Sequence, residues 1–220
     1  MRTARHDRVP TTAPRRHYRM VSAWAAAHAL TWRWCGAVLV AWAAVSLFAA
    51  ITVPIKYPYE ALGTVVDSGV IAGIVIPVIV SCTVLYEGPR DLIGSAARRL
   101  IVPRIALVSG IYVLTSAAAV VTAVIASLPV VIVTVDAMLF VALCALGVSL
   151  LGVGLGWLLP VVFAFVFSAP GLVPWEYNVI YQRDVSNAYL ALVAGALIAG
   201  MGAYASQGSR DRIVDRSVQG

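Results

Sequence analysis

The stretch AMLFVALCALGVSLLGVGLGWLLPVVFAFVFSAPGL, residues 137–172, decides the fold. Its 36 residues include no Asp, Glu, Lys, Arg or His. As one helix it would be about 54 Å long at roughly 1.5 Å per residue, far longer than the roughly 30 Å hydrocarbon core of a bilayer. We therefore predict two membrane spans, 137–153 and 157–172, with a chain reversal between them. Small residues that permit a tight turn or close helix packing lie near the middle: Gly147, Gly152, Gly154 and Gly156.

The composition of the whole chain is that of a protein lying mostly in a membrane. Of its 220 residues, 61% are hydrophobic and only 12% are charged, and the mean hydropathy is +0.90. These values exclude a soluble globular domain of this length. The polar segments are too short for a soluble catalytic or nucleotide-binding domain. Any ATP-driven work therefore requires a partner protein.

Four further apolar stretches have the length and composition of membrane spans, each of which needs about 20 mostly apolar residues. They are 35–53, 68–85, 105–127 and 188–205. Together with the two spans above, they predict an all-α polytopic membrane helix bundle with six transmembrane helices, covering 35–205. Pro77 lies in the middle of the second span, where its missing backbone N–H should kink the helix.

Short connections are expected at the outer side of this bundle. The first and third are 55–67 and 170–187, and the second is a tight turn over 128–136 with Pro129 and Asp136 as its helix breakers. The acidic residues nearest to the spans are Asp67 and Asp136. Both are expected at outer helix ends, where a carboxylate commonly caps a helix.

The positions of the positive charges orient the bundle. Fourteen of the sixteen Lys and Arg residues lie in three regions: before the first span, between the second and third spans, and in the C-terminal tail. The other two are Lys56 and Arg183. Because basic loops resist translocation, both termini are predicted to be cytoplasmic. A five-span arrangement would place the C-terminal arginines outside. The basicity thus indicates a multi-pass plasma-membrane protein in contact with lipid, with no nucleic acid as partner.

The ends of the chain differ from the spans in composition. Residues 1–19 are rich in Arg, Pro and Thr, and predict a mobile basic cytoplasmic tail. In 20–34, aromatic and apolar residues recur at helical spacing beside arginines, which favours an interfacial helix in the headgroup layer. The alternative is that 20–34 forms the inner end of a long first span. Residues 206–220 are predicted to be a cytoplasmic C-terminal tail.

The residue types needed for intramembrane catalysis do not converge in this sequence. All three histidines precede the first span, so none can act as a base or metal ligand within the bundle. Cys35, Cys82 and Cys144 lie in apolar segments without framework spacing, and are expected to be packing residues. We predict that the chain is not an enzyme and has no catalytic residue, metal or cofactor.

The most polar internal stretch, 86–104, lies between the second and third spans. Pro89 and Asp91 suit a helix start, and Arg98 and Arg99 suit its end, where cations oppose the helix dipole. Apolar residues of this stretch fall on one face of the predicted helix. A short cytoplasmic amphipathic helix of this kind either lies on lipid or fits a groove on another protein.

Taken together, these segments resemble the permease subunit of an ATP-binding-cassette exporter of the type-2 class. The resemblance is architectural and covers about 20–205. It rests on four stretches: MVSAWAAAHALTWRW (20–34), GPRDLIGSAARRL (88–100), LGVSLLGVGLGWLLPVVFAF (146–165) and VPWEYNVIYQRDVSN (173–187). These match the family's interfacial helix, its coupling helix, the turn between its fourth and fifth spans, and a polar excursion before its last span. Trp157 stands where the family usually has a basic residue.

The resemblance implies that the bundle pairs with a second copy or a paralogous permease, and that the coupling helix contacts a separate ATPase subunit. The substrate would be apolar or amphipathic. The alternative hypothesis is a non-transporting membrane scaffold or an accessory subunit of a larger complex. The aromatic residues Trp175, Tyr177 and Tyr181 are candidates for an outer gate, although their composition favours an aromatic belt in the headgroup layer. The residues expected to contact the ATPase are Glu87, Arg90, Asp91, Leu92, Ile93, Arg98 and Arg99.

Overall fold

The computed structural model of the chain describes residues 31–85, 101–152 and 154–209. Within these ranges the regular structure is helical, and only two isolated β-bridges occur, with no strand. The predicted basic tail over 1–19, most of the predicted interfacial helix, the predicted coupling helix and nearly all of the C-terminal tail lie outside the described residues.

Six helical segments make up the described part of the chain. The first is α2 (Trp32–Ser46), continued by the 3-10 turn η1 (Leu47–Ala50). The second comprises α3 (Gly69–Gly73), α4 (Val75–Cys82) and η3 (Thr83–Leu85). The others are α5 (Ile101–Ile125), α6 (Val130–Leu151), α7 (Leu158–Ser168) and α8 (Asn187–Gln207), and the short turns η2 (Tyr59–Ala61) and η6 (Trp175–Tyr177) lie in the connections.

Four of these segments are long and apolar enough to cross a membrane: Trp32–Ala50, Ile101–Ile125, Val130–Leu151 and Asn187–Gln207. The second segment, Gly69–Leu85, and the fifth, Leu158–Ser168, are apolar but shorter. At about 1.5 Å per residue, α7 is only about 16 Å long, roughly half the thickness of the hydrocarbon core. The all-helical architecture is thus confirmed for the described residues, and four of the six predicted spans have the length and composition needed to cross a membrane.

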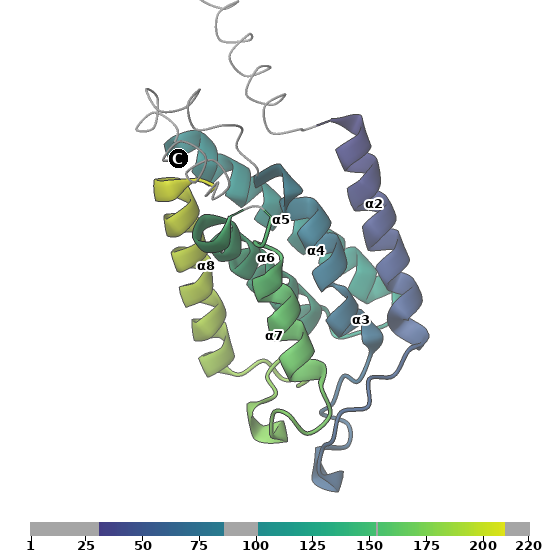
Figure 1. Cartoon of the computed structure of the whole chain (residues 1–220). Helices are drawn as coiled ribbons and strands as arrows, with labels where there is room; N and C mark the ends of the chain where they lie inside the picture. Colours follow the sequence, from purple (N-terminus) through teal and green to yellow (C-terminus); the bar gives the residue numbers. More distant parts are fainter. Residues whose placement is uncertain (1–30, 86–100, 153, 210–220) are drawn as a thin grey trace, which may run out of the picture.

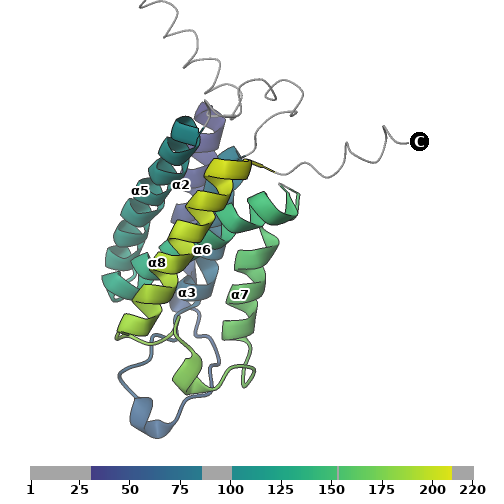
Figure 2. The ribbon, with the colours of Figure 1, turned by 90° about the vertical axis from the view of Figure 1, so that its left-hand side faces the viewer.

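Successive segments run in opposite directions between two ends of one bundle (Figure 1). The end drawn at the top, called here the upper end, holds the end of α4 and the start of α5 beside the end of α8. The hydroxyl of Tyr204 donates to the Leu85 carbonyl over 2.9 Å, which joins these parts directly. The lower end holds the loops that follow η1 and α7. Figure 2 shows α8 in front of α6, with α5 and α7 on either side.

Helix α6 forms the centre of the bundle and packs against α4, α5, α7 and α8. In its most apolar stretch, 67% of the residues are buried within the chain, whereas only 17% are buried in the corresponding stretch of the first segment. Gly200 of α8 allows a close approach to α6, because a Cβ at this position would lie 2.7 Å from the Ala142 carbonyl oxygen. Small residues at helix contacts are typical of membrane bundles, where backbone proximity supplies the packing energy.

The predicted outer turn over 128–136 is wrong. Helix α6 begins at Val130, directly after Pro129, so the connection from α5 is much shorter. The β-branched residues from Val130 onward are compatible with a loop, but an irregular backbone facing lipid would leave its polar groups unpaired. Continuing the helix satisfies those groups. As a consequence, Asp136 lies inside α6 and does not cap its end.

The second segment is interrupted close to Pro77, where the sequence predicts a kink. Helix α3 ends at Gly73 and α4 begins at Val75, with Ile74 between them. Because proline has no N–H, the Gly73 carbonyl, four residues earlier, loses its usual partner. The second segment is therefore interrupted three residues before its proline.

The predicted reversal at the glycine run is also present. Gly152, with φ of 88°, ends α6, and a turn over 154–157 leads into α7. The turn folds back onto α6 so closely that a Cβ on Gly147 would lie 2.2 Å from the Gly156 carbonyl oxygen. Helix α7 then begins at Leu158 and ends at Ser168, and is shorter than the predicted span 157–172.

The first span begins earlier than predicted. Thr31 caps α2 through its side chain, which accepts from the Trp34 backbone N–H, and the helix starts at Trp32. The last three residues of the predicted interfacial segment 20–34 thus form the first turn of α2. The remainder of that segment lies outside the described residues, so the interfacial helix stays a prediction.

Candidate functional site

The most unusual polar group of the bundle is the carboxyl of Asp136. It lies in the second turn of α6, about 9 Å along the helix axis from Val130, and its side chain is fully buried. The Tyr189 hydroxyl of α8 donates to its Oδ1 over 2.5 Å. Its Oδ2 has no hydrogen-bond partner among the described residues. A buried carboxyl thus links the central helix to the last one.

Apolar side chains surround this link along α6. Ile132, Val133 and Phe140 lie on the same helix and are completely buried. A hydrogen bond in such surroundings holds two helices in register, and ionisable residues inside spans are also frequent functional sites. Separation of α6 from α8 would expose both oxygens of the carboxyl. The expectation that the bundle keeps its acidic residues at helix ends is therefore corrected for Asp136.

Asp67, the other acid considered, lies outside the helices. It immediately precedes Ser68, whose side chain accepts from the Val70 backbone N–H and caps α3. The backbone carbonyl of Asp67 accepts from the Val53 N–H over 2.7 Å. The residue that caps this helix is thus Ser68, and the Asp67 side chain is left for other contacts.

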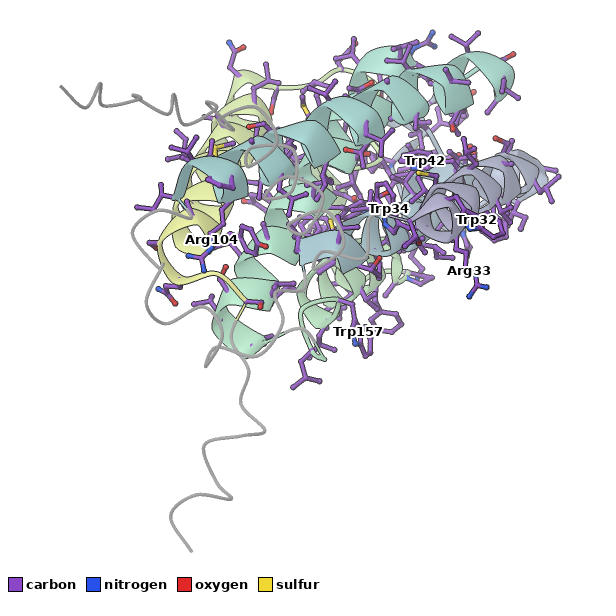
Figure 3. The ribbon with its side chains drawn as sticks, turned by 90° about the horizontal axis from the view of Figure 1, so that it is seen from above. Trp32, Arg33, Trp34, Trp42, Arg104 and Trp157 are labelled. Carbon is purple, nitrogen blue, oxygen red and sulfur yellow. The ribbon has the colours of Figure 1, made fainter. Side chains whose placement is uncertain are left out.

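A second polar arrangement lies at the upper end. Arg104 is only 5% exposed although it lies in the first turn of α5, and its Nη1 donates to the Ala205 carbonyl over 3.2 Å. A cation at the end of a helix offsets the negative end of the helix dipole. Figure 3 shows Arg104 beside the end of α8, whereas Arg33 points away from the bundle.

The two hydrogen bonds at the upper end share one property. The Tyr204 bond holds Leu85, the last residue of η3, and the Arg104 bond holds the first turn of α5. The last turn of α8 is therefore bonded both to the end of the second segment and to the first turn of α5. Sequence reasoning counted Arg104 only as a topological charge and missed this contact, which depends on the packing of α5 against α8.

The predicted ATPase-contact residues all lie outside the described residues, and their role stays a prediction. They are Glu87, Arg90, Asp91, Leu92, Ile93, Arg98 and Arg99.

The three aromatic residues proposed for an outer gate occupy different environments. Tyr181 is fully buried, and its hydroxyl lies 2.6 Å from the Ser168 Oγ. Burial raises the pKa of Tyr181 to about 12, against the opposing effect of the Ser168 hydrogen bond, so the phenol stays protonated at neutral pH. Trp175 packs on Tyr57 with ring centroids 5.9 Å apart, and Tyr177 is 70% exposed.

The loops that carry these aromatics form a cap at the lower end. The Val66 N–H donates to the Tyr181 carbonyl over 2.8 Å, and the Arg183 N–H donates to the Thr64 carbonyl over 2.7 Å. The aromatic contact of Tyr57 with Trp175 joins the same two loops. The structure therefore brings Trp175 and Tyr181 into one cap, but with separate partners.

No group of three or more His, Cys, Asp or Glu side chains that could hold a metal occurs in the described part of the chain. Cys82 and Cys144 are buried, and Cys35 is exposed on α2.

Comparison with known proteins gives no relative: neither a protein-family model, nor a curated protein, nor a solved structure matches this chain.

Proposed function

We propose that this chain is the membrane-spanning permease subunit of an ATP-binding-cassette exporter of the type-2 class. In this proposal it crosses the plasma membrane six times, has both termini in the cytoplasm, and moves an apolar or amphipathic substrate. A separate ATPase subunit supplies the energy. The observation that carries the proposal is the attachment of both ends of segment 86–100 to α8 by Tyr204 and Arg104.

Six crossings are supported by the alternation of the helical segments. The Asp136 contact with Tyr189 joins the beginnings of α6 and α8 near the lower end, and the Arg104 contact with Ala205 joins the beginning of α5 to the end of α8 near the upper end. Helix α7 must then cross with its flanking turns or in a locally thinned bilayer, both of which are modest costs for a short span.

The cytoplasmic assignment of the upper end is supported by charge. Segment 86–100, which connects η3 to α5, carries Arg90, Arg98 and Arg99, and the chain beyond α8 carries three further arginines. Positive charge is concentrated on the cytoplasmic side of membrane proteins. An ATPase would then reach this segment from the cytoplasm.

The attachment suggests how such a partner would move the bundle. A displacement of segment 86–100 would act on Leu85 and on the start of α5, and both are hydrogen-bonded to the last turn of α8. Helix α8 packs closely on the central helix α6 through Gly200, so the displacement would reach the centre of the bundle. Two such bundles, from a second copy or a paralogous permease, would enclose the substrate path.

The charge reversal R98E/R99E tests the partner. If these arginines contact an ATPase, the double variant should recover at least tenfold less ATPase subunit when the tagged chain is purified from its own cells in mild detergent, because each lost charged contact weakens binding by roughly tenfold. Quantitative mass spectrometry of the purified complex, together with its ATP hydrolysis rate, measures the effect.

The matched control is R212E/R216E, which makes the same change of charge in the C-terminal tail. It should retain the ATPase and the hydrolysis rate. Recovery of no ATPase with the unaltered chain would contradict the proposal and favour the alternative, a non-transporting scaffold or accessory subunit. Equal loss in both double variants would show that net charge, and not the predicted contact, governs association.

A further inference from the structure

A cavity of about 300 Å³ opens at the lower end of the bundle. Three connections that are distant in the sequence form its walls. They are residues 65–68 before α3, residues 127–129 between α5 and α6, and Arg183 before α8. This volume is at the lower limit of small-molecule sites, which suits a group the size of a lipid headgroup.

The walls of the cavity present both signs of charge. Its lining residues include the acidic Asp67, the basic Arg183, and the hydroxyl-bearing Ser68 and Ser127. Within the described ranges no ion pair joins Asp67 to Arg183 or to another residue. Both charges are therefore available to a ligand that carries complementary groups.

The backbone holds these two charged residues in fixed relative positions. The Arg183 N–H donates to the Thr64 carbonyl over 2.7 Å, and the Val66 N–H donates to the Tyr181 carbonyl over 2.8 Å, so the loops that carry Arg183 and Asp67 are joined directly. Ser68, next to Asp67, is only 8% exposed and is held by the cap of α3. A site whose walls are positioned before binding loses less conformational entropy when a ligand enters.

The position of Arg183 is notable for a chain of this charge pattern. It is one of only two basic residues outside the predicted cytoplasmic regions, the other being Lys56. Lys56 is not among the residues that line the cavity. Arginines in short loops oppose translocation, so Arg183 at this end makes the predicted orientation of the chain less favourable. Contact with a ligand provides a reason for its presence.

We propose that this cavity binds a small zwitterionic group that carries a primary ammonium and a phosphate or carboxylate. Arg183 would bind the anion through the paired N–H donors of its guanidinium, and Asp67 would accept from the ammonium. The inference rests on the proposed function in one respect, since it makes the cavity an outer-side subsite for the headgroup of an amphipathic substrate. The source is a phosphatidylethanolamine headgroup or a soluble phosphoethanolamine ester.

The test measures binding to the purified full chain in detergent, without any ATPase. Native mass spectrometry is used with three probes: phosphatidylethanolamine, phosphatidylglycerol and soluble glycerophosphoethanolamine. The unaltered chain should bind an ethanolamine probe at least about tenfold more tightly than phosphatidylglycerol, and D67N and R183Q should each remove about tenfold of this affinity. Binding of the lipid identifies a membrane source, and binding of the soluble ester alone identifies a soluble one; both support the site.

The matched controls are D184N and K56Q, which remove the same charges from the same loops outside the cavity lining. They should leave the affinity for the ethanolamine probes within about twofold. The proposal is overturned if the three probes bind equally, or if the controls weaken binding as much as D67N and R183Q. Unchanged thermal unfolding of all four variants shows that they are folded. Because no ATPase takes part in this binding test, a negative result would not affect the interpretation of the R98E/R99E experiment. A negative R98E/R99E result would likewise not affect the binding test.

Discussion

Replacement of Gly200 with leucine should prevent stable packing of α8 against α6 and lower the free energy of unfolding by about 3 kcal/mol, the upper part of the range for overpacked cores. A Cβ at Gly200 would lie 2.7 Å from the backbone carbonyl oxygen of Ala142. Backbone atoms of the central helix cannot move aside as a flexible side chain can, so the two helices must separate. Thermal unfolding in detergent, followed by tryptophan fluorescence, measures the loss.

The same helix supplies the control, Gly195→Leu. A Cβ at Gly195 meets no atom within 4 Å, and the position is exposed, so a leucine there would face lipid. We expect this variant to stay within about 1 kcal/mol of the unaltered chain, since glycine to leucine also favours the helix itself. Equal stability of the two variants would contradict the close contact of α6 with α8.

Replacement of Asp136 with lysine should largely abolish accumulation of the folded protein. The position is fully buried among apolar residues of α6, and burial of a lysine ammonium without a paired carboxylate costs several kcal/mol. The substitution also removes the acceptor of the Tyr189 hydroxyl, which leaves a buried donor without its partner. The amount of monodisperse protein recovered from membranes measures the outcome.

The conservative variant Asp136→Asn tests whether position 136 needs only an acceptor for the Tyr189 hydroxyl or needs the carboxyl itself. Its amide oxygen can still accept from Tyr189, so we expect accumulation and thermal stability near those of the unaltered chain. Damage by Asp136→Asn equal to that by Asp136→Lys would show that the carboxyl itself is required, and an Asp136→Lys variant that folds normally would show that the site is open to water.

Much of the fold could be predicted from the sequence, because a bilayer imposes simple constraints on length and polarity. The apolar length of 137–172 required a reversal, and the glycines there identified it, as the close contact of Gly147 with Gly156 confirms. The proline rule correctly located the interruption before Pro77. Helix ends were less accurate, since β-branched residues after Pro129 are compatible with either a loop or a helix.

The polar contacts could not be predicted, because each joins residues far apart in the chain. Asp136 meets Tyr189 only because α6 and α8 lie side by side, and no local pattern indicates that packing. Arg104 likewise has the sequence features of a cytoplasmic loop arginine, and only the position of Ala205 turns it inward. The cavity residues Asp67 and Arg183 come together through backbone hydrogen bonds between two loops, which composition does not reveal.

The central claim is that the chain crosses the membrane six times, and helix α7 is its most demanding part. Cysteines placed in the turn before α7 and in the loop after it, Leu155→Cys and Tyr177→Cys, test it directly. Both positions are exposed, and the exposed native Cys35 is first replaced by serine. In intact cells, a membrane-impermeant maleimide should label Cys at position 177 at once, and Cys at position 155 only after the membrane is opened. Labelling of position 155 from outside, or of both positions from the same side, would contradict the six-span account.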